Sequence, residues 1–286
     1  MRFLLILWVG LAWALAAQAG PPRLLLDVAR FRNLNQVEKG AEVELYVTVP
    51  TQSLTYRQRA PRAFQSAATV TLEVLKADGQ PAYHEVVVLK PPVITDTTNA
   101  LKNPVAFLKR IHLPDGRYTL RGTVRDQYRS ANGETVVERP LVLATPAGPT
   151  LSDVVLLARP AAKSTGDDVI QRGGYLLTRA PGGFYGRGAD NLYFYAELQG
   201  APAGQPLRLH YHLATPDGSA ADADADLTPL AGRPTTVAGQ LPFGPLPAGE
   251  FTLLVDVYSG QKLLTSHRAT GVRSTTDYAP AGAGAR

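Results

Sequence analysis

One stretch of the sequence occurs twice. Residues 113–124 read LPDGRYTLRGTV and residues 246–257 read LPAGEFTLLVDV, so Leu-Pro-x-Gly-x-aromatic-Thr-Leu recurs. Proline presets a turn and glycine accepts a positive φ angle, after which the aromatic residue, Tyr118 or Phe251, begins a strand. A turn that enters a strand through an aromatic corner is typical of the late strands of an immunoglobulin-like sandwich. The repeat therefore predicts two domains of one kind.

Alternating hydrophobic residues support the same fold class. Apolar side chains occupy every second position over residues 70–74, 192–198 and 207–213, which is the period of a strand with one buried face. Turn signals such as Asp217-Gly218 separate these runs. Beyond the amino-terminal segment no stretch has a helical period. We expect an all-β protein with two tandem immunoglobulin-like β-sandwich domains.

A run of small residues and prolines at 145–150 separates the two copies and suits a short, stiff linker. We expect domain 1 over 20–146, domain 2 over 147–275 and a disordered tail over 276–286. The strands expected in domain 1 lie near 24–31, 42–50, 68–76, 83–89, 105–112, 117–126 and 135–144. Domain 2 offers six or seven strands, and its glycine-rich stretch 160–190, which lacks alternation, is expected to be a long loop.

The first nineteen residues have the pattern of a cleaved signal peptide. Arg2 precedes an uncharged apolar run from Phe3 to Ala17, and Ala17-Gln18-Ala19 supplies the small residues that signal peptidase requires. The run is shorter than the ~20 residues of a membrane-spanning helix. We expect a mature protein that starts at residue 20, lies in the periplasm or outside the cell, and has no transmembrane segment.

Composition excludes several kinds of chemistry. The chain has no cysteine, which excludes disulfides, thiol nucleophiles and a lipid anchor on cysteine. A formal net charge of +5 over 286 residues is a mild excess, and it does not predict a nucleic-acid partner. Stability must come from apolar burial, which a hydrophobic content of 45% can supply.

Three well-known motifs, the Gly-x-Ser-x-Gly elbow, the zinc-protease helix and the phosphate-binding loop, are absent from the sequence. There is no Gly-x-Ser-x-Gly elbow, and His84-Glu85 is followed by Val88 where a zinc protease needs a second histidine. Residues 182–188 are rich in glycine but lack the lysine of a phosphate-binding loop. The sequence predicts a protein that is not an enzyme and that needs no cofactor.

Asp222, Asp224 and Asp226 alternate with alanine, like the start of a calcium loop. An EF-hand then requires glycine at position six and glutamate at position twelve, where this chain has Leu227 and Arg233. The alternative, a strand whose carboxylates face water, fits better.

His210 and His212 share one strand face, and two imidazoles so spaced can bind zinc or copper. Arg208 lies on the same face and opposes a cation, and the sequence shows no third ligand nearby. We therefore expect no metal site.

Two groups of residues are candidates for binding a partner. Phe184, Tyr185 and Arg187 lie in the glycine-rich stretch, where they could contact a protein or a sugar ring, or fold back onto the sandwich edge. Arg117, Arg121 and Arg125 are spaced four residues apart on one strand face and would form a cationic stripe about 26 Å long. The alternative for the arginines is an ordinary solvated face.

Several segments resemble the amino-terminal half of the GWxTD-domain envelope proteins, a family found largely in Bacteroidetes. They are DVARFR (27–32), ELYVTVPTQSLTY (44–56), LEVLKADG (72–79), LPDGRYTLRGTVRD (113–126), LSDVVLLA (151–158), GGYLLTRAPGGFYG (173–186) and NLYFYAEL (191–198). The resemblance implies an exported, β-rich protein without established catalytic residues. The GWxTD motif itself is absent, because both tryptophans, Trp8 and Trp13, lie in the expected signal peptide.

These observations favour a non-catalytic module for protein–protein interaction or structure in the cell envelope, with an envelope protein as its partner. The alternative is a carbohydrate-binding module that uses Phe184, Tyr185, Tyr193 and Tyr195 to contact a glycan.

Overall fold

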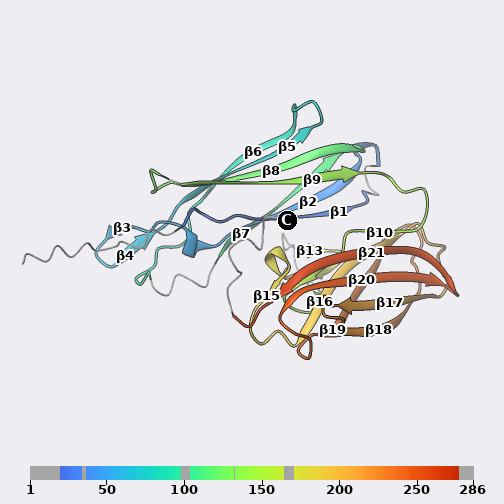
Figure 1. The fold of residues 1–286 in the computed structure, drawn as a ribbon. Helices are drawn as coiled ribbons and strands as arrows, with labels where there is room; N and C mark the ends of the chain where they lie inside the picture. Colours follow the sequence, from blue (N-terminus) through green and yellow to red (C-terminus); the bar gives the residue numbers. More distant parts are fainter. Residues whose placement is uncertain (1–19, 34–36, 98–103, 132, 164–170, 277–286) are drawn as a thin grey trace, which may run out of the picture.

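The computed structural model describes residues 20–33, 37–97, 104–131, 133–163 and 171–276 (Figure 1). The expected signal peptide and nearly all of the expected tail lie outside these residues. The described residues form strands and short 3-10 turns but no α-helix, which confirms the all-β class. Within the same residues, no helix has the length and apolar character to cross a membrane.

Domain 1 is a sandwich of two antiparallel sheets. The first has the order β1-β2-β7, with β1 at Leu25–Phe31, β2 at Ala41–Val49 and β7 at Val105–Leu113. The second has the order β6-β5-β8-β9, with β6 at Pro81–Leu89, β5 at Ala68–Lys76, β8 at Gly116–Asp126 and β9 at Glu134–Leu143. These seven strands were expected from the sequence to within two residues. A hairpin of β3 (Arg57–Ala60) and β4 (Ala63–Gln65) was not expected.

Domain 2 is a second sandwich. One sheet contains β10 (Thr150–Leu151), β11 (Val155–Leu157), β16 (Asn191–Gln199) and β19 (Thr235–Pro242). The other has the order β15-β21-β20-β17-β18, with β15 at Phe184–Tyr185, β21 at Lys262–Arg273, β20 at Gly249–Ser259, β17 at Leu207–Ala214 and β18 at Ala220–Leu227.

The repeated segment has the same place in both sandwiches. Its first copy leads into β8, which lies between β5 and β9, and its second copy leads into β20, which lies between β17 and β21. In domain 1 the first, second and fifth core strands form one sheet and the other four form the second, if the short β3–β4 hairpin is set aside. Domain 2 follows the same pattern if the short strands β10 and β11 are counted as one interrupted strand and β12 to β15 are set aside. The sequence repeat is therefore a repeat of structure.

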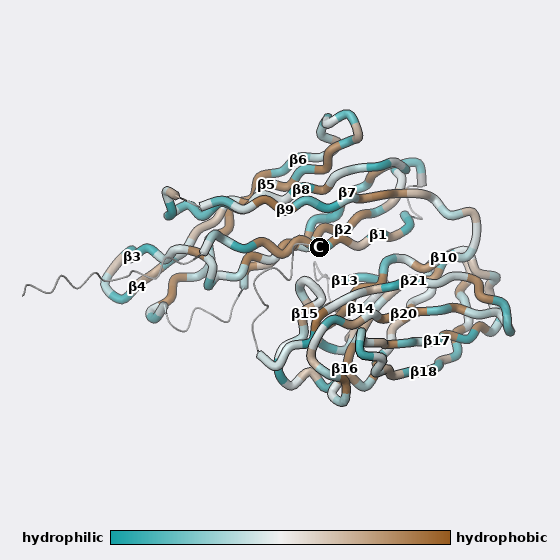
Figure 2. The backbone as a smooth tube through the Cα atoms, viewed as in Figure 1, coloured by the Kyte–Doolittle hydropathy of each residue, from teal (hydrophilic) through white to brown (hydrophobic). Residues whose placement is uncertain are grey.

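Each sandwich encloses its own hydrophobic core. Val70, Leu72 and Val74 are fully buried in domain 1, and Leu192 and Phe194 are buried in domain 2, as their alternation predicted. Figure 2 shows the hydrophobic stretches running along the strands of both sandwiches, whereas most of β3 and several turns are hydrophilic. The period of two thus identifies the inward face of these strands.

The stretch expected to be a long loop is instead structured. Before and after residues 164–170, which lie outside the described residues, it forms a small sheet of β12 (Ala162–Lys163), β14 (Tyr175–Leu176) and β13 (Gln171–Arg172). A 3-10 turn, η4 (Pro181–Gly183), follows, and β15 then pairs in parallel with β21. Gly183 has a φ of +64°, and a Cβ there would lie 2.9 Å from the Thr270 carbonyl oxygen, so glycine permits this close approach. We call residues 158–190 the insertion.

A third hydrophobic cluster lies between the domains. Ala29 and Phe31 of β1 meet residues of β11, β16 and the insertion, among them Leu157, Leu177 and Tyr195. Ala29, Phe31 and Tyr195 lie on the faces of β1 and β16 that point away from the two cores. Figure 1 shows the β1–β2 side of domain 1 facing domain 2. The two sandwiches therefore pack against each other through buried apolar surface.

Candidate functional site

Arg172, on β13 of the insertion, is the centre of the charged part of the interdomain contact. Its guanidinium carbon lies 3.4 Å from the centroid of the Phe31 ring. The same group pairs with Glu42, with Glu44 at 3.0 Å (Nη1 to Oε1) and with Glu197 at 2.9 Å (Nε to Oε1). Glu42 and Glu44 belong to domain 1 and Glu197 to domain 2. One cation thus joins three carboxylates from both sandwiches, and we call these four residues the Arg172 cluster.

Burial makes this cluster electrostatically sensitive. Glu44 is fully buried, and Nε of Arg110 lies 2.8 Å from its Oε1 as a second cation. Burial raises the pKa of Glu197 even though Arg172 and the Tyr195 hydroxyl act to lower it. Burial acts to lower the pKa of Arg172, but the surrounding carboxylates outweigh burial and raise this pKa above its ordinary value. The guanidinium therefore stays charged. Without Arg172, the carboxylates would face one another in a site of low dielectric.

A second contact joins η4 and its neighbourhood to domain 1. The guanidinium carbon of Arg179 lies 3.7 Å from the centroid of the Tyr46 ring. The backbone N–H of Gly182 donates to Oδ2 of Asp27 at 2.7 Å, and Arg179 lies 4.0 Å from the same carboxylate. These contacts add a stacked cation and a charge-assisted hydrogen bond to the interface.

A third contact is made by Arg30 of β1 and Asp153 of the segment between β10 and β11. Nη2 and Nε of Arg30 lie 2.7 and 2.8 Å from the two carboxylate oxygens, and the Arg30 backbone N–H also donates to Oδ2 at 2.8 Å. His267 Nε2 lies 3.1 Å from Oδ1. Burial acts to raise the pKa of Asp153, but the hydrogen bonds of His267 and Arg30 outweigh it and hold the pKa at about 2. Such a bidentate pair fixes orientation as well as distance.

Between these contacts the two sandwiches enclose a cleft. Its volume is about 1080 Å³, and its walls come from β1 and β9 of domain 1 and from η4, β20, β21 and residues 153–156 of domain 2. The lining is mixed in charge, with Arg139 and Arg268 as well as Glu250 alongside the paired groups already described. Clefts at domain interfaces are frequent binding sites, and we call this one the interdomain cleft.

The candidate residues of the glycine-rich stretch do not form a binding loop. Tyr185 is 5% exposed, its ring packs edge-on against Phe243 and Phe251, and its hydroxyl donates to the Leu157 carbonyl at 3.0 Å. Of the two alternatives for this stretch, Tyr185 follows the second: it folds back onto the sandwich, and its ring belongs to the core of domain 2. Phe184 is half-buried in β15, and Arg187 is exposed, with its Nε 3.3 Å from the Thr275 carbonyl oxygen.

Most of the aromatic side chains considered for carbohydrate binding are packed inside the protein. Tyr195 is fully buried, and its hydroxyl donates to Glu197 at 3.0 Å. Tyr193 packs against the interdomain cluster. Neither the Tyr185 ring nor the Tyr195 ring is available to stack on a sugar.

Arg117, Arg121 and Arg125 lie on one outward face of β8, as expected. Arg117 and Arg125 are exposed. Arg121, between them, pairs with Glu138 at 2.5 Å and with Glu73 at 3.8 Å. The stripe is thus interrupted by two carboxylates from the neighbouring strands, and it is not a continuous cationic surface.

Sequence reasoning missed Arg30, Asp153, Arg172 and Arg179. The available signal was indirect: both faces of the strand at 192–198 carry bulky side chains, which predicts that something covers the outer face. Nothing in the local pattern says which residues supply the cover.

Comparisons with known proteins add little. No family model and no curated protein matches this chain. Among solved structures, it is similar to red sea bream transglutaminase, with 14% identity over 88% of this chain and 31% of that one and a TM-score of 0.26. It is also similar to a β-glucuronidase of Bacteroides uniformis, with 10% identity over 81% of this chain and 26% of that one and a TM-score of 0.30. A glycosyl hydrolase family 2 member of Bacteroides cellulosilyticus matches at 8% identity with the same coverage and TM-score. The chain spans between a quarter and a third of the length of these proteins.

Proposed function

We propose that this protein is an exported, non-catalytic interaction module of the cell envelope, related to the amino-terminal half of the GWxTD-domain proteins, and that it binds a segment of another envelope protein in the interdomain cleft. The observation that carries the proposal is the way the cleft is built. Buried ion pairs and stacked cations join the two sandwiches and so fix the distance between the walls of the cleft, and the concave surface exists before a partner arrives. A preformed site loses less conformational entropy on binding.

The chemistry of the cleft favours a protein segment over a sugar. Its walls carry arginines together with carboxylates, a mixture that complements a polar peptide with both signs of charge. Sugar-binding sites rely on exposed aromatic rings, and the Tyr185 and Tyr195 rings are buried elsewhere.

The state of the charged groups supports a role without catalysis. A general acid or base at neutral pH needs a pKa near the working pH. The pKa of Asp153, a half-buried carboxyl of the cleft, is about 2, and its oxygens are paired with Arg30 and His267. This group serves to position the domains.

Site-specific crosslinking in cells tests the proposal. A photo-reactive amino acid at Arg268, which is exposed and lines the cleft, should give one discrete protein adduct. The same amino acid at Val88, 52% exposed on β6 and away from the cleft, should give none. No adduct at Arg268, a glycan adduct, or the same adduct at both positions would contradict the proposal.

Export is tested separately by the intact mass of the protein recovered from its native cells. The expected amino terminus is Gly20, and the expected location is outside the cytoplasm. A mass that still includes Met1 to Ala19 would refute cleavage.

A further inference from the structure

The hairpin of β17 and β18 brings two histidines and a row of aspartates onto one surface. In its register His212 lies opposite Asp222, and His210 lies opposite Asp224. Residues opposite each other in neighbouring strands point to the same side of the sheet. The third ligand that the sequence did not show for the histidine pair thus comes from the neighbouring strand.

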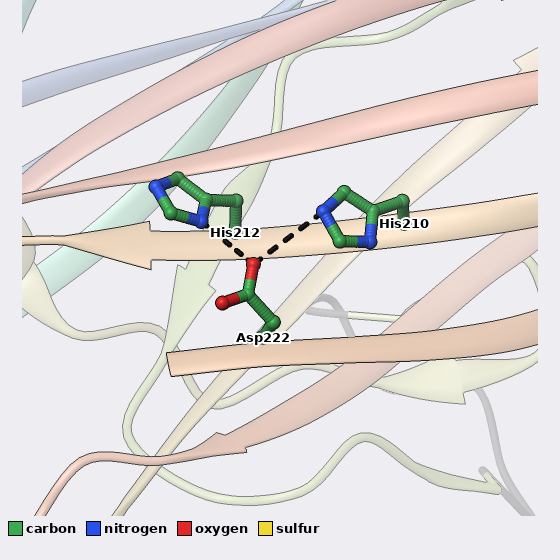
Figure 3. Close-up of side chains that lie close together, drawn as sticks. All are labelled: His210, His212 and Asp222. Carbon is green, nitrogen blue, oxygen red and sulfur yellow. Dashed lines mark hydrogen bonds and ion pairs between the residues drawn. The ribbon is translucent and has the colours of Figure 1, made fainter. Parts of the chain in front are cut away.

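The ligand atoms converge on a single carboxylate oxygen. Oδ1 of Asp222 lies 2.7 Å from Nδ1 of His212 and 3.4 Å from Nε2 of His210, between the two rings (Figure 3). One ligand atom from each of the three residues lies within 4.8 Å of the other two. The two imidazoles are about one-third exposed and Asp222 is about half exposed, so an ion can enter from solvent.

Asp224 positions the His210 ring so that its Nε2 can bind an ion. Its Oδ1 lies 3.0 Å from Nδ1 of His210. When Nδ1 carries the proton it donates to Asp224, and Nε2, the nitrogen that faces Asp222, keeps its lone pair. A carboxylate that fixes the tautomer of a histidine in this way is the usual partner behind a metal-bound imidazole.

A buried carboxylate borders the cluster from the other side. Asp256 of β20 lies opposite His210 in register and is only 8% exposed. Within the described part of the chain its Oδ1 has no hydrogen-bond partner, and its Oδ2 accepts only a long bond of 3.4 Å from the Tyr258 hydroxyl. An uncompensated buried carboxylate is costly, and a cation at His210 would offset that cost.

Arg208, the arginine of β17 on this face, does not block the cluster. Arg208 lies one row along, opposite Asp226, and its guanidinium carbon lies 5.1 Å from the centroid of the Tyr258 ring. Its charge is therefore directed to an aromatic ring one row away from the histidines.

We propose that His210, His212 and Asp222 bind a zinc ion, with Asp224 positioning His210. Two imidazoles and a carboxylate suit zinc, whose bonds of about 2.0–2.1 Å at tetrahedral angles place ligand atoms about 3.3 Å apart. The spacing of His210 and Asp222 already fits, at 3.4 Å. The closer His212–Asp222 pair opens and the histidines approach each other by side-chain rotation. The ion cross-links edge strand β18 to β17 and keeps its fourth position open to solvent for water or a ligand atom of a partner.

Calorimetric titration of the metal-free mature chain with Zn²⁺ tests the site. We expect one ion per chain with micromolar affinity. The double variant H210N/H212N should lose this binding, as should D222N on the other strand, and circular dichroism checks that both remain folded. The matched control is H84N, which removes an exposed histidine from a strand of domain 1 and should leave Zn²⁺ binding unchanged. No binding by the wild type, or equal binding by the wild type and H210N/H212N, would overturn the proposal.

The role of Asp224 needs a readout that a general loss of charge does not reproduce. Asp224→Asn should weaken binding about 10–100-fold, whereas Asp226→Asn, the same charge loss one row along, should have little effect. With Co²⁺ as an optical probe, the ion bound by Asp224→Asn should keep the wild-type absorption band, because the three ligands are unchanged. Equal losses in the two variants, or a changed band, would overturn the positioning role.

Discussion

At the scale of single residues, the corner aromatics show how two copies of one motif were stabilised differently. The hydroxyl of Tyr118 donates to the Pro114 carbonyl at 3.0 Å, while its half-buried ring packs at the edge of the core of domain 1. Phe251 has no hydroxyl, is 2% exposed, and packs edge-on against Tyr185 and Phe243. The first copy combines a polar tether with packing, and the second relies on an aromatic cluster.

This difference predicts unequal costs of substitution. Tyr118→Phe should lower the free energy of unfolding by about 0.5 kcal/mol, the lower end for one hydrogen bond, because the bond is exposed to solvent. Phe251→Ala should cost about 3–5 kcal/mol, because it leaves a cavity in a closed core. Urea unfolding of the mature chain, followed by circular dichroism, measures both. Equal costs would show that the packing of the Phe251 ring contributes no more than the exposed hydrogen bond of Tyr118, and would contradict this account.

The residues that the sequence placed correctly are those whose neighbours along the chain define their surroundings. Leu120 and Val124 follow the alternation of their strand and are fully buried. The position of Tyr185 stayed open between two alternatives because its short strand has no period of its own. Its burial depends on pairing with Arg273 in β21, far away in the sequence.

At the scale of elements, the insertion distinguishes domain 2 from domain 1. It supplies Arg172, Leu177 and Arg179, which all contact or approach domain 1. It also covers the outer face of β16, which explains why Tyr195 and Glu197 are buried on the side away from the core. The insertion is therefore the element that turns two similar sandwiches into one assembly.

Arg172 is the residue of the insertion on which we expect docking to depend most. Arg172→Met should cost about 3–5 kcal/mol, because it leaves buried carboxylates without their shared cation. Glu197→Gln should cost far less, because burial already raises the pKa of Glu197 and disfavours its charge. Thermal and urea unfolding compare the two variants directly. If Arg172→Met were no more harmful than Glu197→Gln, the cluster would contribute little to docking.

The sequence predicted elements well where strands are long and alternate. It gave the seven main strands of domain 1 and the equivalence of β8 and β20. It did not predict the insertion, because its strands β12 to β15 are two residues each and exist only through pairing with distant segments.

At the scale of the whole molecule, the Arg30–Asp153 pair makes docking sensitive to acid. The pKa of Asp153 is about 2, below its ordinary 3.8, so its ionised form is favoured in the folded protein. A depressed carboxyl pKa contributes stability that is complete above the ordinary pKa and is lost as pH falls from about 4 to about 2. The shift corresponds to roughly 2 kcal/mol.

Unfolding free energies measured across that pH range test this linkage. Other carboxylates also titrate there, so the informative quantity is the difference between the wild type and Asp153→Asn. We expect this difference to shrink as the pH falls through the range. A difference that is independent of pH would mean that Asp153 does not stabilise the protein through its charge.

The relative placement of the domains was beyond sequence reasoning. The Arg172 cluster joins Glu42 and Glu44 to Glu197, residues that belong to different sandwiches and share no local pattern. A charged residue on a strand normally marks a solvated face, and only the meeting of two such faces turns these into buried ion pairs. The candidate site is therefore a property of the assembled molecule.

The central claim is that both sandwiches form one rigid unit with a preformed cleft, and a distance measurement tests it most directly. Because the chain has no cysteine, Gln80→Cys and Gln261→Cys, both in exposed turns, can carry one spin label on each domain. Pulsed electron–electron double resonance should then give a single narrow distribution of distances between the two labels, and Arg172→Met should broaden it. A broad or multi-peaked distribution in the otherwise wild-type protein would show that the domains move independently, and it would contradict the account.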